Sequence, residues 1–264
     1  MPVTASDRAL AERLADAAGD AIRPFFRASF AHELKADGSP VTQADRAAEA
    51  AMRRLLDAEA PGDGVVGEEY GEKPGVTGRR WVLDPIDGTR SFTAGRAIFG
   101  TLIALLEGDW PVLGVIDQPI QRERWVGVAG RPTLFNGKPV RTRPCAALEG
   151  AVLATTSPHL FAGDEVDGYM RLALAVAGGN LRQGPVYGGD CYNYALIASG
   201  QLDLVCEAGL ALHDFAALVP VVEGAGGRMC DWQGDPLSAA SAGQVLAIGD
   251  PARVDDVLEA MAGG

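Results

Sequence analysis

The stretch Trp81 to Phe92, WVLDPIDGTRSF, places two carboxylates three residues apart at the point where an apolar run ends. The run itself predicts a buried strand. Pro85 lacks an amide hydrogen and Gly88 permits dihedrals that other residues avoid, so we expect the strand to end in a turn. Two acids in so short a turn repel each other unless something cationic joins them. The stretch therefore predicts a functional site where a buried core would otherwise continue.

The oxygen atoms near this turn are of the kind that hard divalent cations bind. Asp84 and Asp87 supply carboxylates, and Ile86 supplies a main-chain carbonyl. Glu68 follows the short predicted strand GVVG, and Asp214 begins a predicted helix far along the chain. Mg²⁺ prefers such ligands, and two metal ions can orient a phosphate and stabilise the leaving oxygen. The residues alone thus predict a metal-dependent hydrolase.

Each of these acids also has an ordinary structural interpretation when it is taken singly. Glu68 and Glu69 would form a solvated pair in a surface loop. Asp84 would be a turn former before proline, and Asp214 would be a helix N-cap. The combination of D-P-I-D-G-T with a preceding apolar strand is what favours the metal site.

Composition and charge restrict the classes of function. The chain of 264 residues has 23 Lys and Arg against 35 Asp and Glu, and a net charge of −12 disfavours nonspecific binding to nucleic acid. No apolar run approaches the roughly 18 residues that a membrane span needs. The N-terminal segment is charged and lacks the apolar core of a secretory signal, so we expect a cytoplasmic protein without a membrane partner. The four cysteines lack CxxC spacing and are expected to be reduced.

The pattern of predicted helices and strands changes near the middle of the chain. Residues 1–145 predict an α+β half with most of the metal ligands, and residues 146–264 predict an α/β half with the substrate-side residues, packed as one compact unit. In the first half we predict helices ending near Arg27 and Ala58, the second capped by Thr42, and a hairpin turn at Asn136-Gly137. In the second half we predict strands at 151–156, 181–184, 202–206, 228–232 and 244–248 and helices at 164–177, 190–199, 213–224 and 251–262.

Four stretches, in this order and at these separations, resemble the signatures of the inositol monophosphatase family: KADGSPVTQAD, GEEY, WVLDPIDGTRSF and HDFAALVPVVEGAGG. This is a family of Mg²⁺-dependent, lithium-sensitive phosphatases. The resemblance implies an α/β fold, specifically a layered α/β/α/β/α sandwich. It also implies two or three Mg²⁺ ions, a small phosphate ester as substrate, and a homodimer.

Position by position, the resemblance assigns the metal ligands. It makes Glu68, Asp84 and the carbonyl of Ile86 ligands of the first metal ion. Asp84, Asp87 and Asp214 would hold the second. By the same resemblance, Asp87 and Asp214 would also face the substrate.

The resemblance also assigns the catalytic residues. It pairs Asp45 with Thr89, so that the aspartate orients the threonine hydroxyl, and Thr89 with Glu68 would position the water for in-line attack on phosphorus. The amides of Gly88 and Thr89 would face the phosphate at the start of a helix, where amide dipoles favour an anion. The family commonly has tryptophan where this chain has His213, which we expect mainly to support packing.

Three stretches resemble the histidinol-phosphatase branch of the family more closely than the inositol branch: FGTLIALLEGDWPVLGVIDQPIQRERWVGV, YGGDCYNYALIASGQLDLVCEAGL and DFAALVPVVEGAGGRMCDWQGDPL. In that branch the substrate is L-histidinol phosphate, late in histidine biosynthesis. Asp190 falls where inositol-cleaving relatives have a small, uncharged segment, and a carboxylate there suits the ammonium group of histidinol. Glu207 matches a family position that contacts the leaving alcohol. The alternative interpretation of Asp190 is a helix N-cap.

Other activities stay open from the sequence. Inositol-1-monophosphatase and broad sugar-phosphate phosphatase activities occur in the same family. Larger anionic substrates would require additional Lys or Arg near the pocket, where NLRQGPVYGGD offers only Arg182. A regulatory binding role is the alternative outside enzyme function, but the acidic balance disfavours contact with RNA.

Overall fold

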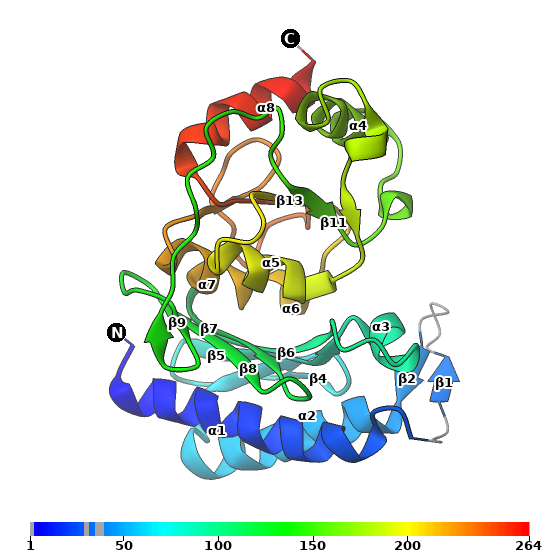
Figure 1. Ribbon diagram of the computed structural model, residues 1–264. Helices are drawn as coiled ribbons and strands as arrows, with labels where there is room; N and C mark the ends of the chain where they lie inside the picture. The colour runs from blue at the N-terminus through cyan, green and yellow to red at the C-terminus, as the bar shows by residue number, and fades with distance from the viewer. Residues whose placement is uncertain (1–2, 29–31, 35–39, 264) are drawn as a thin grey trace.

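The computed structural model describes residues 3–28, 32–34 and 40–263, which form five alternating layers of helix and sheet (Figure 1). Two N-terminal helices cover a large sheet, a central layer of helices separates it from a smaller sheet, and two further helices cover the far side of the smaller sheet. The predicted α/β/α/β/α sandwich is confirmed. Residues 35–39 of the motif KADGSPVTQAD lie outside the described residues, as does the side chain of Thr42.

The outer helix layer consists of α1 (Ala5–Ile22) and α2 (Gln43–Glu59). α1 begins with a capping box, in which the Thr4 hydroxyl accepts from the Asp7 amide and the Asp7 carboxylate accepts from the Thr4 amide. Both helices bury alanine, leucine and other apolar side chains at helical spacing against the sheet. α2 also buries two acids, Asp45 and Glu49, and Glu49 is paired with Arg53 on the same helix. Buried acids are rare without a partner or a function.

An eight-stranded sheet forms the second layer, with the order β10-β9-β8-β7-β6-β5-β3-β4. β3 and β5 are parallel, and the other neighbouring strands are antiparallel. The predicted Asn136-Gly137 turn joins β9 to β10, and both residues have positive φ. The strands are β3 (Gly64–Gly67), β4 (Gly71–Lys73), β5 (Arg79–Asp87), β6 (Gly100–Glu107), β7 (Trp110–Gln118), β8 (Glu123–Val128), β9 (Leu134–Phe135) and β10 (Lys138–Pro139). A separate two-stranded sheet pairs β1 (His32–Leu34) with β2 (Pro40–Thr42).

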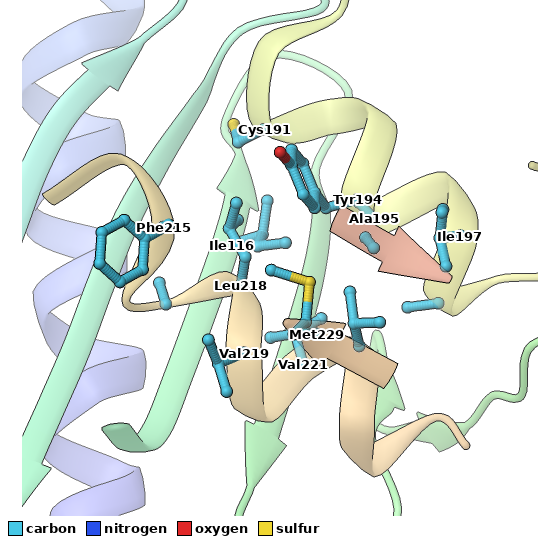
Figure 2. Close-up of a cluster of buried hydrophobic side chains, with 14 of the residues drawn as sticks. Ile116, Cys191, Tyr194, Ala195, Ile197, Phe215, Leu218, Val219, Val221 and Met229 are labelled. Atoms are coloured by element: carbon cyan, nitrogen blue, oxygen red, sulfur yellow. The ribbon is translucent and has the colours of Figure 1, made fainter. Parts of the chain in front are cut away.

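The central layer contains α5 (Asp190–Ala198), α6 (Leu212–Phe215) and α7 (Leu218–Gly224). Figure 2 shows apolar side chains from these helices meeting Ile116 of the large sheet and Met229 of the smaller one. This core contains residues from both halves of the sequence. The division of the chain into two subdomains at residue 145 stays a prediction.

Two glycines allow the central layer to lie close to the large sheet. Gly114 and Gly127 face each other on β7 and β8. A Cβ atom at Gly114 would lie 2.0 Å from the Ala217 carbonyl oxygen, and one at Gly127 would lie 2.2 Å from the Pro220 carbonyl oxygen. The chain around α7 therefore rests directly on the backbone of the sheet, a distance that no side chain would permit.

The helix predicted over residues 213–224 is wrong, because the structure divides it into α6 and α7. Pro220 lies in the first turn of α7. It has no amide hydrogen to donate toward Ala216, and its ring crowds that carbonyl, so a continuous helix would be kinked. The break falls at residues 216–217, and Asp214 lies on α6, before the break.

The smaller sheet has five strands in the order β12-β11-β13-β15-β14, with β12, β11 and β13 parallel and the other pairs antiparallel. Its outer face is covered by α4 and α8 (Figure 1). The elements are β11 (Leu153–Thr155), β12 (Val186–Tyr187), β13 (Leu204–Glu207), β14 (Arg228–Cys230), β15 (Val245–Ile248), α4 (Asp164–Val176) and α8 (Val254–Ala262). The short 3₁₀ turns are η1 (Arg23–Phe25), η2 (Pro158–Leu160), η3 (Leu181–Gln183) and η4 (Pro251–Arg253).

The strand predicted at 181–184 is also wrong. Residues 181–183 form η3, because the Asn180 side chain accepts a hydrogen bond from the Arg182 amide and closes a turn. The strand β12 begins only after Pro185. The four cysteines are buried and free, as expected. Within the described ranges, no helix combines the length and apolar character needed to cross a membrane.

Candidate active site

An irregularity in β5 brings Asp84 and Asp87 to the same side of the large sheet. In a regular strand, residues three apart point to opposite faces. In β5, Asp84 pairs with Leu102 and Asp87 pairs with Gly100, so three steps on one strand match two steps on its neighbour. The extra residue forms a bulge that shifts the alternation by one position. Both carboxylates can therefore serve one site.

Asp214 completes a cluster of three carboxylates with Asp84 and Asp87. One oxygen from each residue lies within 4.8 Å of the other two. Asp214 is carried by α6, and its Oδ2 accepts a 2.7 Å hydrogen bond from the Ala211 amide at the start of that helix. Asp214 is thus inside the first turn of α6 and is not the N-cap residue, which is Ala211.

Burial and mutual repulsion raise the pKa values of the clustered acids. The pKa of Asp84 stands well above its ordinary value because the residue is buried and because Glu68, Asp87 and Asp214 are close. The pKa of Asp87 is raised by burial, by Asp190 and by Asp214. A cation bound among these acids would offset the repulsion and lower both pKa values.

Glu68 and Asp45 approach the cluster from neighbouring elements. Glu68 directly follows β3, and β3 is the parallel neighbour of β5, so the ends of the two strands lie side by side. Asp45 lies in the first turn of α2 with 1% of its surface exposed, and its charge adds to the raised pKa of Asp84. The assignments of Glu68 as a metal ligand and of Asp45 as a catalytic residue stay predictions.

The D-G-T turn leads directly into α3 (Thr89–Thr93), as expected for a turn at the end of the strand. Gly88 has a φ of 84°, a value that residues with a side chain rarely adopt. A Cβ atom at Gly88 would also lie 2.6 Å from Asp190 Oδ2. The Thr89 hydroxyl donates a 3.1 Å hydrogen bond to the Ile86 carbonyl, so the group predicted to orient water and the carbonyl predicted to bind metal are adjacent.

An open cleft of about 730 Å³ contains the predicted substrate-side residues. Its walls come from the turn after β5, from the ends of β11 and β13 and from the first turns of α3, α5 and α6. This volume lies within the range of pockets that bind small metabolites. The predicted site residues that line the cleft are Asp87, Gly88, Thr89, Asp190, Glu207 and Asp214.

Asp190 is the first residue of α5, and its carboxylate reaches α3. The N-cap of α5 is Gly189 and no side chain caps the helix, so the structure does not support the N-cap interpretation of Asp190. Its Oδ2 accepts a 3.1 Å hydrogen bond from the Ser91 hydroxyl. Burial raises the pKa of Asp190, while Ser91, Arg96 and Arg90 act in the opposite direction.

Glu207, at the end of β13, has both carboxylate oxygens engaged by the protein. Oε1 accepts from the Thr156 amide at 2.9 Å and from the Thr156 hydroxyl at 2.6 Å. Oε2 accepts from the Tyr194 hydroxyl at 3.0 Å. Burial raises the pKa of Glu207 to about 7, although these donors oppose the rise. The carboxylate thus supports the cleft wall, and its contact with the leaving alcohol stays a prediction.

Sequence reasoning missed two arginines of the cleft. Arg90 and Arg96 both line it and both are exposed, whereas Arg182, the basic residue singled out from the sequence, is not part of the lining. Arg90 directly follows the D-G-T turn, and this adjacency was the available signal. Arg96 follows α3 by three residues, and only the tertiary structure places it beside Gly188.

Two hydroxyl groups of the site were also missed, whereas the position of His213 does not contradict its expected role in packing. The Ser91 hydroxyl donates to Asp190, and Thr156 binds both Glu207 and the Asp190 amide. Neither residue was predicted, because these contacts join residues that are far apart in the sequence. His213 is not among the lining residues, and its Nε2 lies 3.5 Å from Asp214 Oδ1.

Comparisons with known proteins agree with this geometry. The profile of the inositol monophosphatase family matches residues 5–258. The bifunctional phosphatase IMPL2, chloroplastic, of Arabidopsis thaliana is 47% identical over 262 residues, with 96% of this chain and 74% of that protein covered. The histidinol-phosphatase of Chlorobaculum parvum is 37% identical over 229 residues, with 86% of each chain covered. A solved structure of an inositol monophosphatase from Zymomonas mobilis is 54% identical, with 98% of this chain and 100% of that chain covered and a TM-score of 0.88.

The layered fold and the acidic cleft together define a metal-dependent phosphatase. The chain belongs to the inositol monophosphatase family, which is generally Mg²⁺-dependent. The site fits such a cofactor, because three carboxylates converge within 4.8 Å and two of them have raised pKa values that a divalent cation would lower.

Proposed function

We propose that this protein is a Mg²⁺-dependent phosphomonoesterase that hydrolyses L-histidinol phosphate to L-histidinol and phosphate, a step of histidine biosynthesis. The observation that carries the proposal is the position of Asp190. Its carboxylate lines the same cleft as Asp87 and Asp214, and it does not cap its own helix. The similarity to the histidinol-phosphatase of Chlorobaculum parvum supports the same substrate.

The phosphate end of the substrate would lie at the acid cluster. Asp84, Asp87 and Asp214, with Glu68 and the Ile86 carbonyl, would hold two or three Mg²⁺ ions. When bound, Mg²⁺ supplies positive charge that binds phosphate oxygens, makes water a better nucleophile and stabilises the leaving oxygen. Repulsion among these acids raises the pKa values of Asp84 and Asp87, and bound cations would offset that repulsion.

The protein's own residues would then orient the reacting groups. The amides of Gly88 and Thr89 lie at the start of α3 and offer donors to phosphate oxygens. The Thr89 hydroxyl and Glu68 would hold the attacking water in line with the phosphorus. Asp45, buried behind them on α2, would hold the Thr89 hydroxyl in the required rotamer.

The alcohol end of the substrate would lie toward Asp190. Histidinol carries an ammonium group and a titratable imidazole, and a carboxylate in a partly desolvated cleft binds such cations by charge-assisted hydrogen bonds. Asp190 Oδ2 already accepts from Ser91, and in the described part of the chain no hydrogen bond engages Oδ1. One oxygen is therefore available for a substrate donor.

A second candidate is hydrolysis of inositol-1-phosphate or other sugar phosphates. Arg90 and Arg96 line the same cleft, and their guanidinium groups suit hydroxylated or additionally anionic substrates. The similarity to the Zymomonas mobilis inositol monophosphatase also supports this candidate. Asp190 argues against inositol-1-phosphate hydrolysis as the main activity. Inositol carries no cationic group that the Asp190 carboxylate could bind.

The proposal also includes a homodimer, with neither a nucleic-acid nor a membrane partner. The exposed strand β12 supports a second copy as partner, since Val186 and Tyr187 are each 51% exposed. Sedimentation velocity at several protein concentrations tests this part, and a concentration-independent monomer would refute it.

The experiment that tests the substrate is a comparison of phosphate-release rates on L-histidinol phosphate, inositol-1-phosphate and fructose bisphosphate at equal Mg²⁺. We expect the specificity constant for L-histidinol phosphate to exceed the others by at least about tenfold. Equal or higher constants for either sugar phosphate would refute the assignment. A parallel assay with excess chelator controls for metal dependence.

A further inference from the structure

Asp190 is held by two contacts that come from different layers of the molecule. On the side-chain end, Oδ2 accepts a 3.1 Å hydrogen bond from the hydroxyl of Ser91, which is buried on α3. On the main-chain end, the Asp190 amide donates a 3.1 Å hydrogen bond to Thr156 Oγ1. The Thr156 hydroxyl in turn donates to Glu207. The Asp190 carboxylate therefore has a defined direction, set by Ser91.

The backbone at Asp190 is unusual in a way that makes this direction matter. Its φ is 43°, in the left-handed region that a residue with a side chain rarely adopts. This conformation is maintained by the Thr156 contact and by the next amide, that of Cys191, which donates to Asp87 Oδ2 at 2.6 Å. A strained residue held by several contacts is typical of a functional position.

A competing partner for the carboxylate lies nearby. The guanidinium of Arg96 is close enough to the Gly188-Gly189 turn that a Cβ atom at Gly188 would lie 3.3 Å from Nη2. Arg96 is exposed and lines the same cleft as Asp190. If the carboxylate rotated away from α3, an ion pair with this guanidinium would neutralise it, and a cationic substrate would lose its partner.

We propose that Ser91 is a specificity-determining positioning residue: its hydroxyl holds the Asp190 carboxylate against α3 and out of a direct ion pair with Arg96, so that the cleft selects phosphate esters whose leaving alcohol carries a cation. This inference rests on the proposed function. It adds that the selectivity depends on a hydroxyl that does not itself touch the substrate. The same helix that begins with the predicted phosphate-binding amides thus also sets the group that recognises the alcohol.

The test measures kcat and KM on L-histidinol phosphate and on inositol-1-phosphate for the wild type and for Ser91→Ala. The ratio of the two specificity constants should fall about tenfold, mainly through a higher KM for L-histidinol phosphate. Combining Ser91→Ala with Arg96→Gln should restore most of the ratio, because the competing cation is gone. Combining Ser91→Ala with Asp190→Asn should give the ratio of Asp190→Asn alone.

Two variants separate this role from a structural one. Thr93→Ala removes another hydroxyl from α3, one that donates to the Arg90 carbonyl, and should leave the ratio unchanged. Ser91→Cys keeps the size of the side chain with a weaker donor, so a folded protein with an intermediate ratio is expected even if Ser91→Ala proves unstable.

The outcomes also separate this inference from the proposed function. A wild type that does not prefer L-histidinol phosphate refutes the proposed function. A wild type that prefers it, with a ratio that falls in Asp190→Asn but not in Ser91→Ala, refutes the role of Ser91 alone. Failure of Arg96→Gln to restore the ratio refutes the competition between Ser91 and Arg96.

Discussion

The Cys191 amide donates a 2.6 Å hydrogen bond to Asp87 Oδ2. This contact joins the first turn of α5 to the end of β5, two elements separated by about a hundred residues of sequence. It places Asp190, the residue before Cys191, beside the acid cluster. This hydrogen bond therefore links the metal side of the proposed site to its alcohol side.

Asp87→Asn should abolish phosphatase activity, with a loss of at least about 100-fold, because it replaces a charged ligand by a neutral one. The same change should raise the melting temperature of the metal-free protein, since it removes one of the repelling charges that raise the pKa of Asp84. Phosphate release with Mg²⁺ and a melting curve in chelator check the two outcomes. Full activity of the wild type in excess chelator would contradict the metal dependence.

Thr89→Ala should lower kcat by a factor on the order of 100 and leave metal affinity largely intact, because the hydroxyl orients a reactant and is not an anionic ligand. Steady-state kinetics and Mg²⁺ titration measure the two effects. A change confined to KM, with kcat unchanged, would exclude this role. Thr93→Ala on the same helix is the matched control.

Asp190→Asn should weaken L-histidinol phosphate selectively, because a charge-assisted contact contributes roughly 1.5–3 kcal/mol and a neutral amide keeps only part of it. Inositol-1-phosphate, which has no cation, should change little. Asparagine tolerates the left-handed backbone at this position, so stability should be nearly unaffected. A lower melting temperature with an unchanged ratio of specificity constants would mean that Asp190 is purely structural.

Glu207→Gln should remove a pH dependence of stability. The folded pKa of Glu207 is about 7 and the reference value is 4.5, so between these values the folded carboxyl keeps a proton that the unfolded one has released. Stability is therefore lost as pH rises through this window, by about 3 kcal/mol relative to the variant. Chemical denaturation at several pH values measures the difference between the two proteins.

Glu123→Gln is the control for the Glu207 experiment. Glu123 also accepts from a tyrosine hydroxyl, that of Tyr192, but it is partly exposed. Its variant keeps the buried carboxyl of Glu207 and should therefore keep the pH-dependent loss of stability that this carboxyl causes. Parallel profiles for the wild type and Glu207→Gln would show that burial does not shift Glu207 as described.

Gly127→Ala should destabilise the protein by about 2–3 kcal/mol, because the new Cβ atom would lie 2.2 Å from the Pro220 carbonyl oxygen and would push α7 off the sheet. Gly168→Ala is the matched control in α4, where the nearest atoms lie 3.4 Å away or more. That change should be neutral or stabilising by up to about 1 kcal/mol, since alanine favours the helix. Equal effects of the two variants in urea denaturation would contradict the close packing of α7.

Local patterns in the sequence were sufficient for the elements whose geometry depends on near neighbours. The strand before Asp84, the turn at Gly88 and the Asn136-Gly137 hairpin were all predicted, because each depends on a few adjacent residues. The helix over 213–224 was wrong because the apolar pattern around Pro220 outweighed the effect of the proline. The strand at 181–184 was wrong because the turn closed by the Asn180 side chain was not recognised.

The sequence by itself determined the α/β class and the identity of the clustered acids, because strand ends and turn residues are read from consecutive positions. The layered arrangement was expected only from the resemblance to the inositol monophosphatase family. Only the tertiary structure decided which residues from other parts of the chain contact these acids. Ser91 reaches Asp190, Cys191 reaches Asp87, and Arg96 reaches the same cleft through packing of α5 against the large sheet. Contacts between residues far apart in the chain depend on how whole layers pack, and no local pattern encodes their distances.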